Sequence, residues 1–151
     1  MMLYAEKDVQ IYFLAYLQLF WLACTTSLRN ITLNAVFIEA TTLYLKPNAD
    51  WLKDGARFAV SANNPGMKWF DMEEVGCSGI YSCVIQGNFK QVFFVRMNPA
   101  TTDNDWNNKW NQAPSNNAID IPTDGKNLYA ITDWNNGEWE PEPFNPLAYT
   151  I

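Results

Sequence analysis

The stretch from Asp103 to Gln112 sets Trp106 and Trp110 among amides and carboxylates, with hardly an aliphatic residue beside them. An aromatic residue of a core normally sits in an apolar alternation, so both rings are expected at the surface. Indole faces pack on the C–H faces of sugar rings, and amide side chains bond hydroxyls as donors and acceptors. The predicted hydroxyl-bonding residues are Asn107, Asn111 and Gln112. The alternative is a polar loop anchored by two partly buried tryptophans.

Other tryptophans occur in different surroundings. Trp51 follows a turn at 48–50, which favours an exposed role in binding. Trp69 lies beside Phe70 at the start of a predicted strand, so its ring is expected to be half in the core. Trp134 and Trp139 bracket a turn, and we expect them to clamp the last strand against its sheet.

Composition narrows the class of protein. A chain of 151 residues supports one domain with a sizeable core, and an aromatic content of 15% argues against disorder. The net charge is −6 and no basic cluster occurs, which argues against a nucleic-acid partner. The absence of histidine removes the commonest general base and the commonest metal ligand. We therefore predict no cofactor and no bound metal.

The acidic residues do not form the pattern of a catalytic or calcium site. Asp103, Asp105 and Asp124 are not spaced as in a calcium-binding loop, and they are expected to be solvated loop carboxylates. Glu73 and Glu74 would point to opposite faces of a strand, so they cannot act together as acid and nucleophile. No hydrolase, zinc or phosphate-loop motif occurs. The sequence favours a protein that is not an enzyme.

The elements that must position these residues begin after a distinct N-terminal part, residues 1–40. The apolar run Ile11–Cys24 has 14 residues, against the about 20 that a membrane span needs. Its length suits an export signal, although the preceding Glu6-Lys7-Asp8 lacks positive charge. A buried helix and a mis-assigned start remain open. We favour export, with a membrane contact only through this signal or anchor, and hence an extracellular or cell-surface location.

From Thr41 onward the chain alternates between short apolar runs and turn residues, which predicts strands throughout. The fold class predicted for residues 41–151 is an all-β, antiparallel, immunoglobulin-like β-sandwich with an irregular C-terminal tail, preceded by a short helical segment. The expected strands are Thr42–Lys46, Arg57–Ala62, Lys68–Met72, Ile80–Ile85, Gln91–Met97, Ala118–Ile121 and Asn127–Thr132. Gln91–Met97 is apolar on both faces and should be central. Three cysteines, Cys24, Cys77 and Cys83, are expected to be unpaired.

A recurrent order of motifs follows these strands. It comprises Leu43–Asn48, Trp51, Ala56–Ala59, Lys68-Trp69, Gly79–Tyr81, Val92–Phe94, Arg96–Pro99, Trp106–Gln112 and Ile121–Asn127. Over about residues 42 to 139, this order resembles the small starch-binding β-sandwiches of carbohydrate-binding module family 26 and their gut-bacterial relatives.

The resemblance implies binding of α-glucans through aromatic side chains on one edge of the sandwich, without catalysis. Trp51 and Trp69 match family tryptophans near that edge. The second strand of the family reads aromatic-x-aromatic, whereas this chain has Phe58-Ala59-Val60 and lacks the second ring. Trp106 and Trp110 lie in an insertion-like loop, similar to loops of the gut-bacterial relatives.

Together these features predict a monomeric module that binds a polysaccharide, an α-glucan above all, through Trp51, Trp69, Trp106 and Trp110. The competing hypothesis is a structural or adhesive β-sandwich of a surface or phage protein. Exposed aromatic residues serve protein interfaces as readily as sugar sites. The amide-rich surroundings of Trp106 and Trp110 favour sugar.

Overall fold

The computed structural model describes residues 39–149, and these are all-β with almost no helix. The strands are β1 (Ala40–Lys46), β2 (Arg57–Asn63), β3 (Met67–Asp71), β4 (Glu73–Glu74), β5 (Tyr81–Gln86), β6 (Gln91–Met97), β7 (Lys109–Ala113), β8 (Ile119–Asp120), β9 (Leu128–Ile131) and β10 (Gly137–Trp139). Two 3-10 turns, η1 (Lys53–Gly55) and η2 (Pro146–Tyr149), complete the described elements. The predicted N-terminal segment lies outside the described residues.

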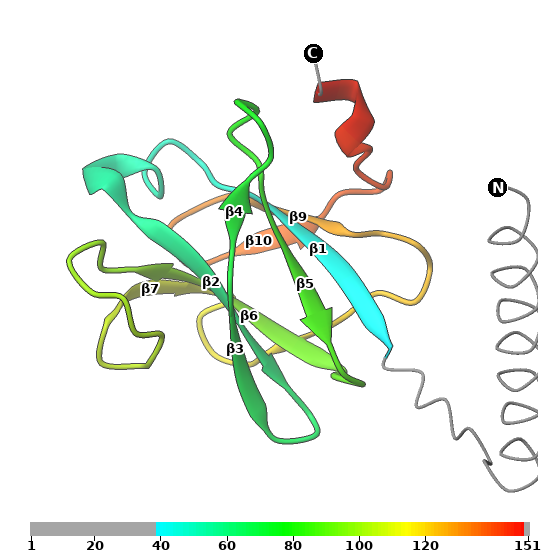
Figure 1. The fold of residues 1–151 in the computed structure, drawn as a ribbon, viewed down its shortest axis with the longest axis horizontal. Coiled ribbons are helices and arrows are strands. Elements are labelled where there is room, and N and C mark those ends of the chain that lie inside the picture. Colours follow the sequence, from blue (N-terminus) through cyan, green and yellow to red (C-terminus); the bar gives the residue numbers. More distant parts are fainter. Residues whose placement is uncertain (1–38, 150–151) are drawn as a thin grey trace, which may run out of the picture. The chain divides into compact units, whose positions relative to one another are not determined.

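The strands form two sheets (Figure 1). One has the order β10-β9-β1-β5-β4, and the other has the order β3-β2-β6-β7 with β8 also paired to β6. The expectation of a wholly antiparallel arrangement is wrong at one place, because β1 and β9 run parallel with Tyr44 opposite Leu128. These two strands are far apart in sequence, so no tight hairpin dictates that they run in opposite directions.

The core lies where the inner faces of the two sheets meet. Leu43, Leu45 and Ile85 come from the first sheet, and Val60 and Phe94 from the second, and all five are fully buried. Each such side chain contributes about 1.5–3 kcal/mol by leaving water. Burial of these inner faces against one another is the main term that holds the two sheets together.

Strand β2 carries position 60, where the resemblance implied a second aromatic residue and this chain has valine. Phe58 and Val60 share one face of the strand, and both are buried in the core between the sheets. The strand is also central in its sheet, with β3 on one side and β6 on the other. An aromatic residue at position 60 would therefore face the core and not a ligand.

Strand β6 is central, as predicted, since it pairs with β2, β7 and β8. Val92 and Phe94 face the core, whereas Val95 and Met97 face outward and are nevertheless fully buried. A sheet face that is buried on its outer side needs a cover. The cover comes from the loop that leads into β7.

Three strands were not predicted. The stretch that was expected to be a polar loop contains β7, and β4 and β10 are short edge strands. Strand β10 begins at Gly137, where a Cβ atom would stand 2.4 Å from the Ala130 carbonyl oxygen and 2.5 Å from the Tyr129 ring. Only glycine fits that close approach of β10 to β9.

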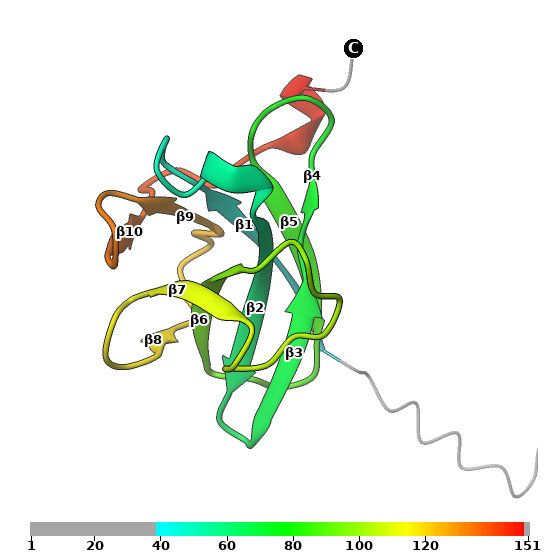
Figure 2. The ribbon, with the colours of Figure 1, turned by 90° about the vertical axis from the view of Figure 1, so that its left-hand side faces the viewer.

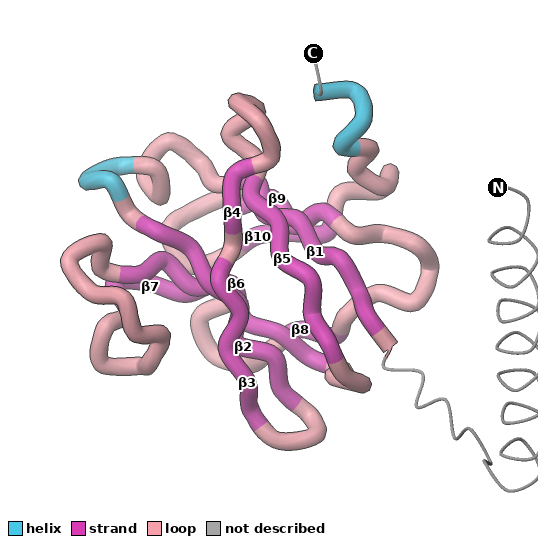
Figure 3. The backbone as a smooth tube through the Cα atoms, in the orientation of Figure 1, coloured by secondary structure: helices cyan, strands magenta, loops and turns pink. Residues whose placement is uncertain are grey.

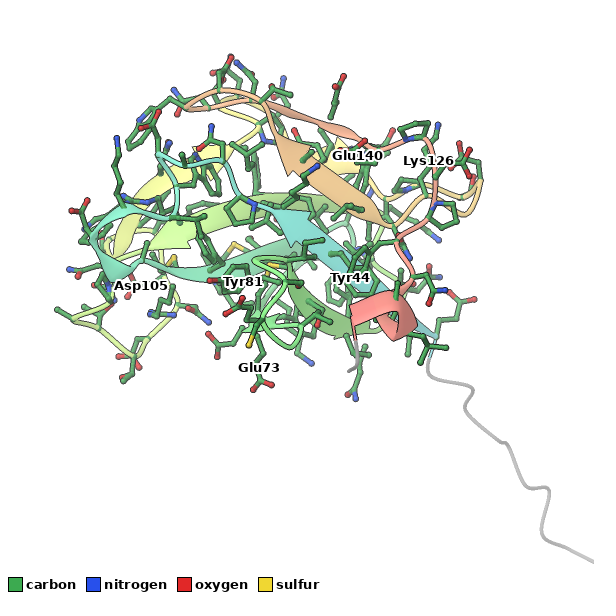
Figure 4. The ribbon with its side chains drawn as sticks, turned by 90° about the horizontal axis from the view of Figure 1, so that it is seen from above. Tyr44, Glu73, Tyr81, Asp105, Lys126 and Glu140 are labelled. Atoms are coloured by element: carbon green, nitrogen blue, oxygen red, sulfur yellow. The ribbon has the colours of Figure 1, made fainter. Side chains whose placement is uncertain are left out.

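The C-terminal segment packs on the outer face of the first sheet. The ring of Phe144 lies 4.7 Å from the ring of Tyr44, and the Phe144 amide donates to the Asn127 side chain at 2.7 Å. Figure 4 shows Tyr44 beside this segment.

Cys77 and Cys83 are both free thiols, as expected, and burial raises the pKa of Cys83 to about 12.

Candidate binding site

A bulge in β7 separates the two tryptophans that sequence reasoning grouped together. Asn111 pairs with Arg96 of β6 and Lys109 with Met97, so Trp110 is an extra residue between the two pairs. A bulge leaves the extra residue unpaired and redirects its side chain. Trp110 accordingly packs over Arg96, which lies on the core-facing side of β6. Trp106 lies on the outer face of the same sheet. The two rings do not form one shared platform.

Trp106 belongs to what we call the outer-face cluster, formed by Trp69, Phe93, Trp106 and Lys109. The Trp106 ring meets Trp69 edge-on at 4.8 Å and Phe93 at 5.7 Å, both between ring centroids. The Lys109 ammonium lies 5.4 Å from the same ring. With 37% of its surface exposed, Trp106 covers the apolar outer face and still presents part of its indole to solvent.

The loop that carries Trp106 is shaped by a capped turn at residues 105–108. The Asp105 carboxylate accepts the backbone N–H groups of Asn107 at 2.7 Å and Asn108 at 2.8 Å, and also the Asn108 side-chain amide at 3.2 Å. Such Asx turns fix a loop without help from a strand. Figure 3 shows this region as loop leading into β7, and Figure 4 places Asp105 at its outer end.

Arg57 fastens the start of the same loop to β2. Its guanidinium donates to the carbonyl oxygens of Thr101 at 2.8 Å and Asp103 at 2.7 Å, and it also bonds the Asn104 side chain. Of the two acidic residues in this loop, Asp105 shapes the turn with its carboxylate, whereas Asp103 takes part through its backbone carbonyl. Among residues 39–149, no three histidine, cysteine or carboxylate side chains gather closely enough to hold a metal ion.

The second cluster, which we call the end cluster, consists of Trp51, Arg96, Trp110 and Trp134. The Arg96 side chain is only 4% exposed, and its guanidinium carbon lies 4.7 Å from the Trp110 ring centroid and 5.6 Å from the Trp134 ring centroid. A buried cation must find partners in place of water, and indole faces are the most favourable aromatic partners. Arg96 thereby holds Trp110 and Trp134, residues that are still 41% and 49% exposed.

Hydrogen bonds from Arg96 join the end cluster to the loop at 47–55. The guanidinium donates to the carbonyl oxygens of Trp51 at 2.8 Å and Lys53 at 2.6 Å, and to the Asp54 carboxylate at 3.3 Å. Asp54 adopts a positive φ of 61°, which places its carboxylate within reach. This guanidinium therefore has both polar and aromatic partners, and its position is tightly defined.

The backbone at Trp134 is fixed by two further donors. Its carbonyl oxygen accepts the Trp51 indole N–H at 2.9 Å and the Asn111 side-chain amide. Neighbouring Asn48 donates to the Asp133 carbonyl at 3.3 Å. Hydrogen bonds therefore join three separate segments at one end of the domain, namely the loop at 47–55, strand β7 and the turn at 132–136 (Figure 2).

The turn at 133–136 repeats the geometry of the turn at 105–108. The Asp133 carboxylate accepts the backbone N–H groups of Asn135 at 2.9 Å and Asn136 at 2.8 Å, and the Asn136 side-chain amide at 3.1 Å. The Asn136 side chain, followed by these backbone groups, lowers the pKa of Asp133 because each donor stabilises the ionised form. The loop thus depends on a charged carboxylate.

The expectation that Trp51 is exposed is wrong. Its surface is 0% exposed, and its ring lies parallel to Phe58 at 6.2 Å in the core. The preceding turn suggested exposure, but the Asn48 side chain accepts the Trp51 backbone N–H and directs the chain inward. A ring that is wholly buried cannot stack on a ligand. Trp51 instead supports Trp134 through its indole N–H.

The three residues that were predicted to bond sugar hydroxyls differ in burial and in hydrogen bonding. Asn111 is buried and its amide is used by Trp134 and Gln112, so its place in the site is also wrong. Gln112 bonds Lys109 at 2.6 Å and the Ser115 carbonyl at 3.0 Å. Asn107 is exposed, and only its backbone N–H is engaged within the described residues. Trp69 is half-buried on the outer face, as expected.

Sequence reasoning missed Arg96 and Trp134. Arg96 stood at a core-facing position of an otherwise apolar strand, and a charge there signals a specific set of partners. Trp134 was expected to clamp the last strand, but it is the most exposed tryptophan of the described residues. Trp139 does fulfil that role, packing on Tyr129 at 5.2 Å and Phe94 at 5.8 Å.

A groove of about 700 Å³ lies elsewhere, between the 78–80 loop and the C-terminal segment. Leu52, Ile80, Leu128 and Phe144 contribute its apolar walls, and no tryptophan lines it.

Within residues 39–149, no helix is long and apolar enough to cross a membrane. Comparisons of the chain with protein-family models, with curated proteins and with solved structures found no match.

Proposed function

We propose that residues 39–149 form an immunoglobulin-like β-sandwich module that binds carbohydrate without catalysis, and that its principal contact surface is the end cluster. The observation that carries this proposal is the pair Trp110 and Trp134, which are 41% and 49% exposed yet anchored on one buried guanidinium. Rings that are held in place before a ligand arrives lose little conformational entropy on binding. Stacking on a sugar ring needs such fixed aromatic faces.

The electrostatics around these rings favour a neutral ligand. Asp50 is paired with Lys53 at 2.5 Å, and Asp54 with Arg96 at 3.3 Å, so the nearby charges largely compensate one another. The remaining Asp133 carboxylate is exposed and would repel an anionic polysaccharide. The resemblance to starch-binding modules makes an α-glucan the first candidate, with export of the protein and a cell-surface or extracellular role as further parts of the proposal.

The expected affinity is low. Stacking on an aromatic ring contributes roughly 1–3 kcal/mol, so two rings support a Kd in the range of about micromolar to millimolar. An open, rigid surface of this kind suits recognition of a repetitive polymer, where many equivalent ligand units are available.

Retention of the full-length protein on insoluble starch, followed by a glycan array, tests this function. We expect Trp134→Ala and Trp110→Ala each to reduce retention at least tenfold, because each substitution removes a stacking face. Val84→Ala is the matched control, since Val84 is exposed on β5 of the other sheet. Far-UV circular dichroism establishes that each variant is folded.

Two outcomes would overturn the proposal. Failure of the wild-type protein to bind any glycan on the array would leave protein contact as the better account of the exposed rings. Undiminished retention by Trp110→Ala and Trp134→Ala would show that the end cluster is not the contact surface.

A further inference from the structure

The tetrapeptide Asp-Trp-Asn-Asn occurs twice in the chain, at 105–108 and at 133–136. Both copies fold into the same turn, in which the aspartate carboxylate accepts two backbone N–H groups and the amide of the last asparagine. Each turn also leads directly into a strand at the edge of one sheet, β7 in one case and β10 in the other. The two copies thus share their sequence, the hydrogen bonds to their aspartate carboxylate and their place just before an edge strand.

Both turns present the same chemical groups. Trp106 and Trp134, at the second position, are 37% and 49% exposed. Asn107 and Asn135, at the third position, use their backbone N–H in the turn and have no side-chain hydrogen bond within the described residues. An exposed indole next to an unused amide offers a stacking face together with one acceptor and two donors.

Each indole is also held by a basic group. The Lys109 ammonium lies 5.4 Å from the Trp106 ring centroid, and the Arg96 guanidinium carbon lies 5.6 Å from that of Trp134. The turn at 133–136 belongs to the end cluster, and the turn at 105–108 to the outer-face cluster. The repeated arrangement therefore occurs on two different faces of the domain.

We propose that the turn at 105–108 is a second carbohydrate contact site, equivalent to the one at 133–136, so that one domain engages a polysaccharide at two places. This inference rests on the proposed function. The residues of the second site are Trp106, which stacks on a sugar ring, and Asn107, whose side-chain amide bonds a hydroxyl. Covering the apolar sheet face explains why Trp106 is partly buried, but it does not require an exposed indole beside an amide side chain that makes no hydrogen bond among residues 39–149.

Two weak sites on one rigid domain have a measurable consequence. A short oligosaccharide occupies each site independently, with about two ligands bound per protein at saturation. A polymer engages both sites at once, so its apparent affinity exceeds that of the oligosaccharide by about 10²-fold or more where the geometry permits simultaneous contact.

Isothermal titration of the full-length protein with an oligosaccharide, paired with retention on the matching insoluble polymer, tests the second site. Asn107→Ala is the decisive variant, because its exposed side chain makes no hydrogen bond among residues 39–149 and can be removed without disturbing the fold. Asn116→Ala, another exposed asparagine, in the loop after β7, is the matched control. Trp106→Ala is the stronger variant, with circular dichroism to confirm that it folds.

The expected result for Trp106→Ala is a fall from about two to about one bound oligosaccharide, and a loss of about 10²-fold in apparent affinity for the polymer, because contact at two places is no longer available. Asn107→Ala should weaken the second site severalfold, and Asn116→Ala should have no effect. One bound oligosaccharide in the wild-type protein would overturn the second site but leave the proposed function standing, as would equal behaviour of Asn107→Ala and Asn116→Ala. Absence of any binding by the wild-type protein would overturn both.

Discussion

The outer-face cluster and the end cluster each expose a tryptophan from the same tetrapeptide, but they support it in different ways. Trp106 rests edge-on against Trp69 and Phe93, above side chains that need a cover. Trp134 rests near a buried guanidinium, and its carbonyl oxygen is fixed by Trp51 and by an amide. Apolar packing therefore dominates on one face and polar contacts to a single cation dominate at the other. An exposed ring can be made rigid by either means.

Removal of Arg96 should have the largest effect on stability. We expect Arg96→Met to lower the free energy of unfolding by roughly 3–5 kcal/mol, because two carbonyl oxygens lose a buried donor and two indoles lose a cation. Urea denaturation measures this change.

Arg57→Met is the substitution on the outer face that corresponds to Arg96→Met in the end cluster. Arg57 also donates to two loop carbonyls, but it is more exposed than Arg96, so water can replace it in part. We expect a loss of about 1–2 kcal/mol. Equal losses for the two substitutions would contradict the view that the end cluster depends on one cation and the outer face on packing.

The two equivalent tryptophans should differ in their contribution to stability. Trp106→Ala uncovers apolar surface on β3 and β6, and we expect it to cost about 2 kcal/mol at about 25 cal/mol per Å² of apolar surface. Trp134→Ala keeps the backbone carbonyl that Trp51 and Asn111 bond, and it should cost less than about 1 kcal/mol. Chemical denaturation of both variants would reveal the order, and the reverse order would show that the end cluster is the better packed of the two.

Loss of the Trp51 indole N–H should have a smaller effect. Trp51→Phe retains a ring against Phe58 but leaves the Trp134 carbonyl with one donor, so we expect a loss of about 1 kcal/mol beyond that of a control. Trp139→Phe is that control, since the Trp139 indole N–H makes no hydrogen bond among residues 39–149. The indole signal of Trp134 in a nitrogen-15 NMR spectrum should broaden or shift in Trp51→Phe alone. An unchanged signal would rule out the supporting role.

Acid should weaken the turn at 133–136. Hydrogen bonds hold the pKa of Asp133 below its ordinary value in the folded protein. The stabilisation is therefore complete above that ordinary value and disappears as the pH falls through the lower, folded pKa. Asp133→Asn should flatten this acid limb of the stability curve, as followed by thermal melts from pH 5 down to about pH 2. An identical acid limb in the variant would mean that other carboxylates account for it.

The strand-forming parts were predictable because they carry their signal locally. Gln91–Met97 reads as a strand that is apolar on both faces, and the structure makes it the central strand β6 with the same bounds. Strand β7 was missed because Lys109–Ala113 has little apolar alternation. It forms because β6 offers it hydrogen-bonding partners, and that pairing is a tertiary effect.

The candidate site divides in the same way. The sequence indicated which residue types the candidate site contains, because tryptophans among amides and carboxylates cannot build a core by themselves. Trp106 and Trp110 are indeed partly exposed, as that composition predicts. Trp51 shows the limit of the local signal, since its polar neighbours suggested the surface and the fold placed its ring in the core.

By itself, then, the sequence determined the all-β class and most of the strands, because alternation and turn residues act between residues that are near one another in the chain. Only the tertiary structure decided which rings meet. The bulge at Trp110 turns neighbouring residues to opposite faces, and Arg96 gathers Trp110 and Trp134 from segments more than twenty residues apart. Such contacts depend on strand register and on the burial of one cation, and neither is encoded in a local pattern.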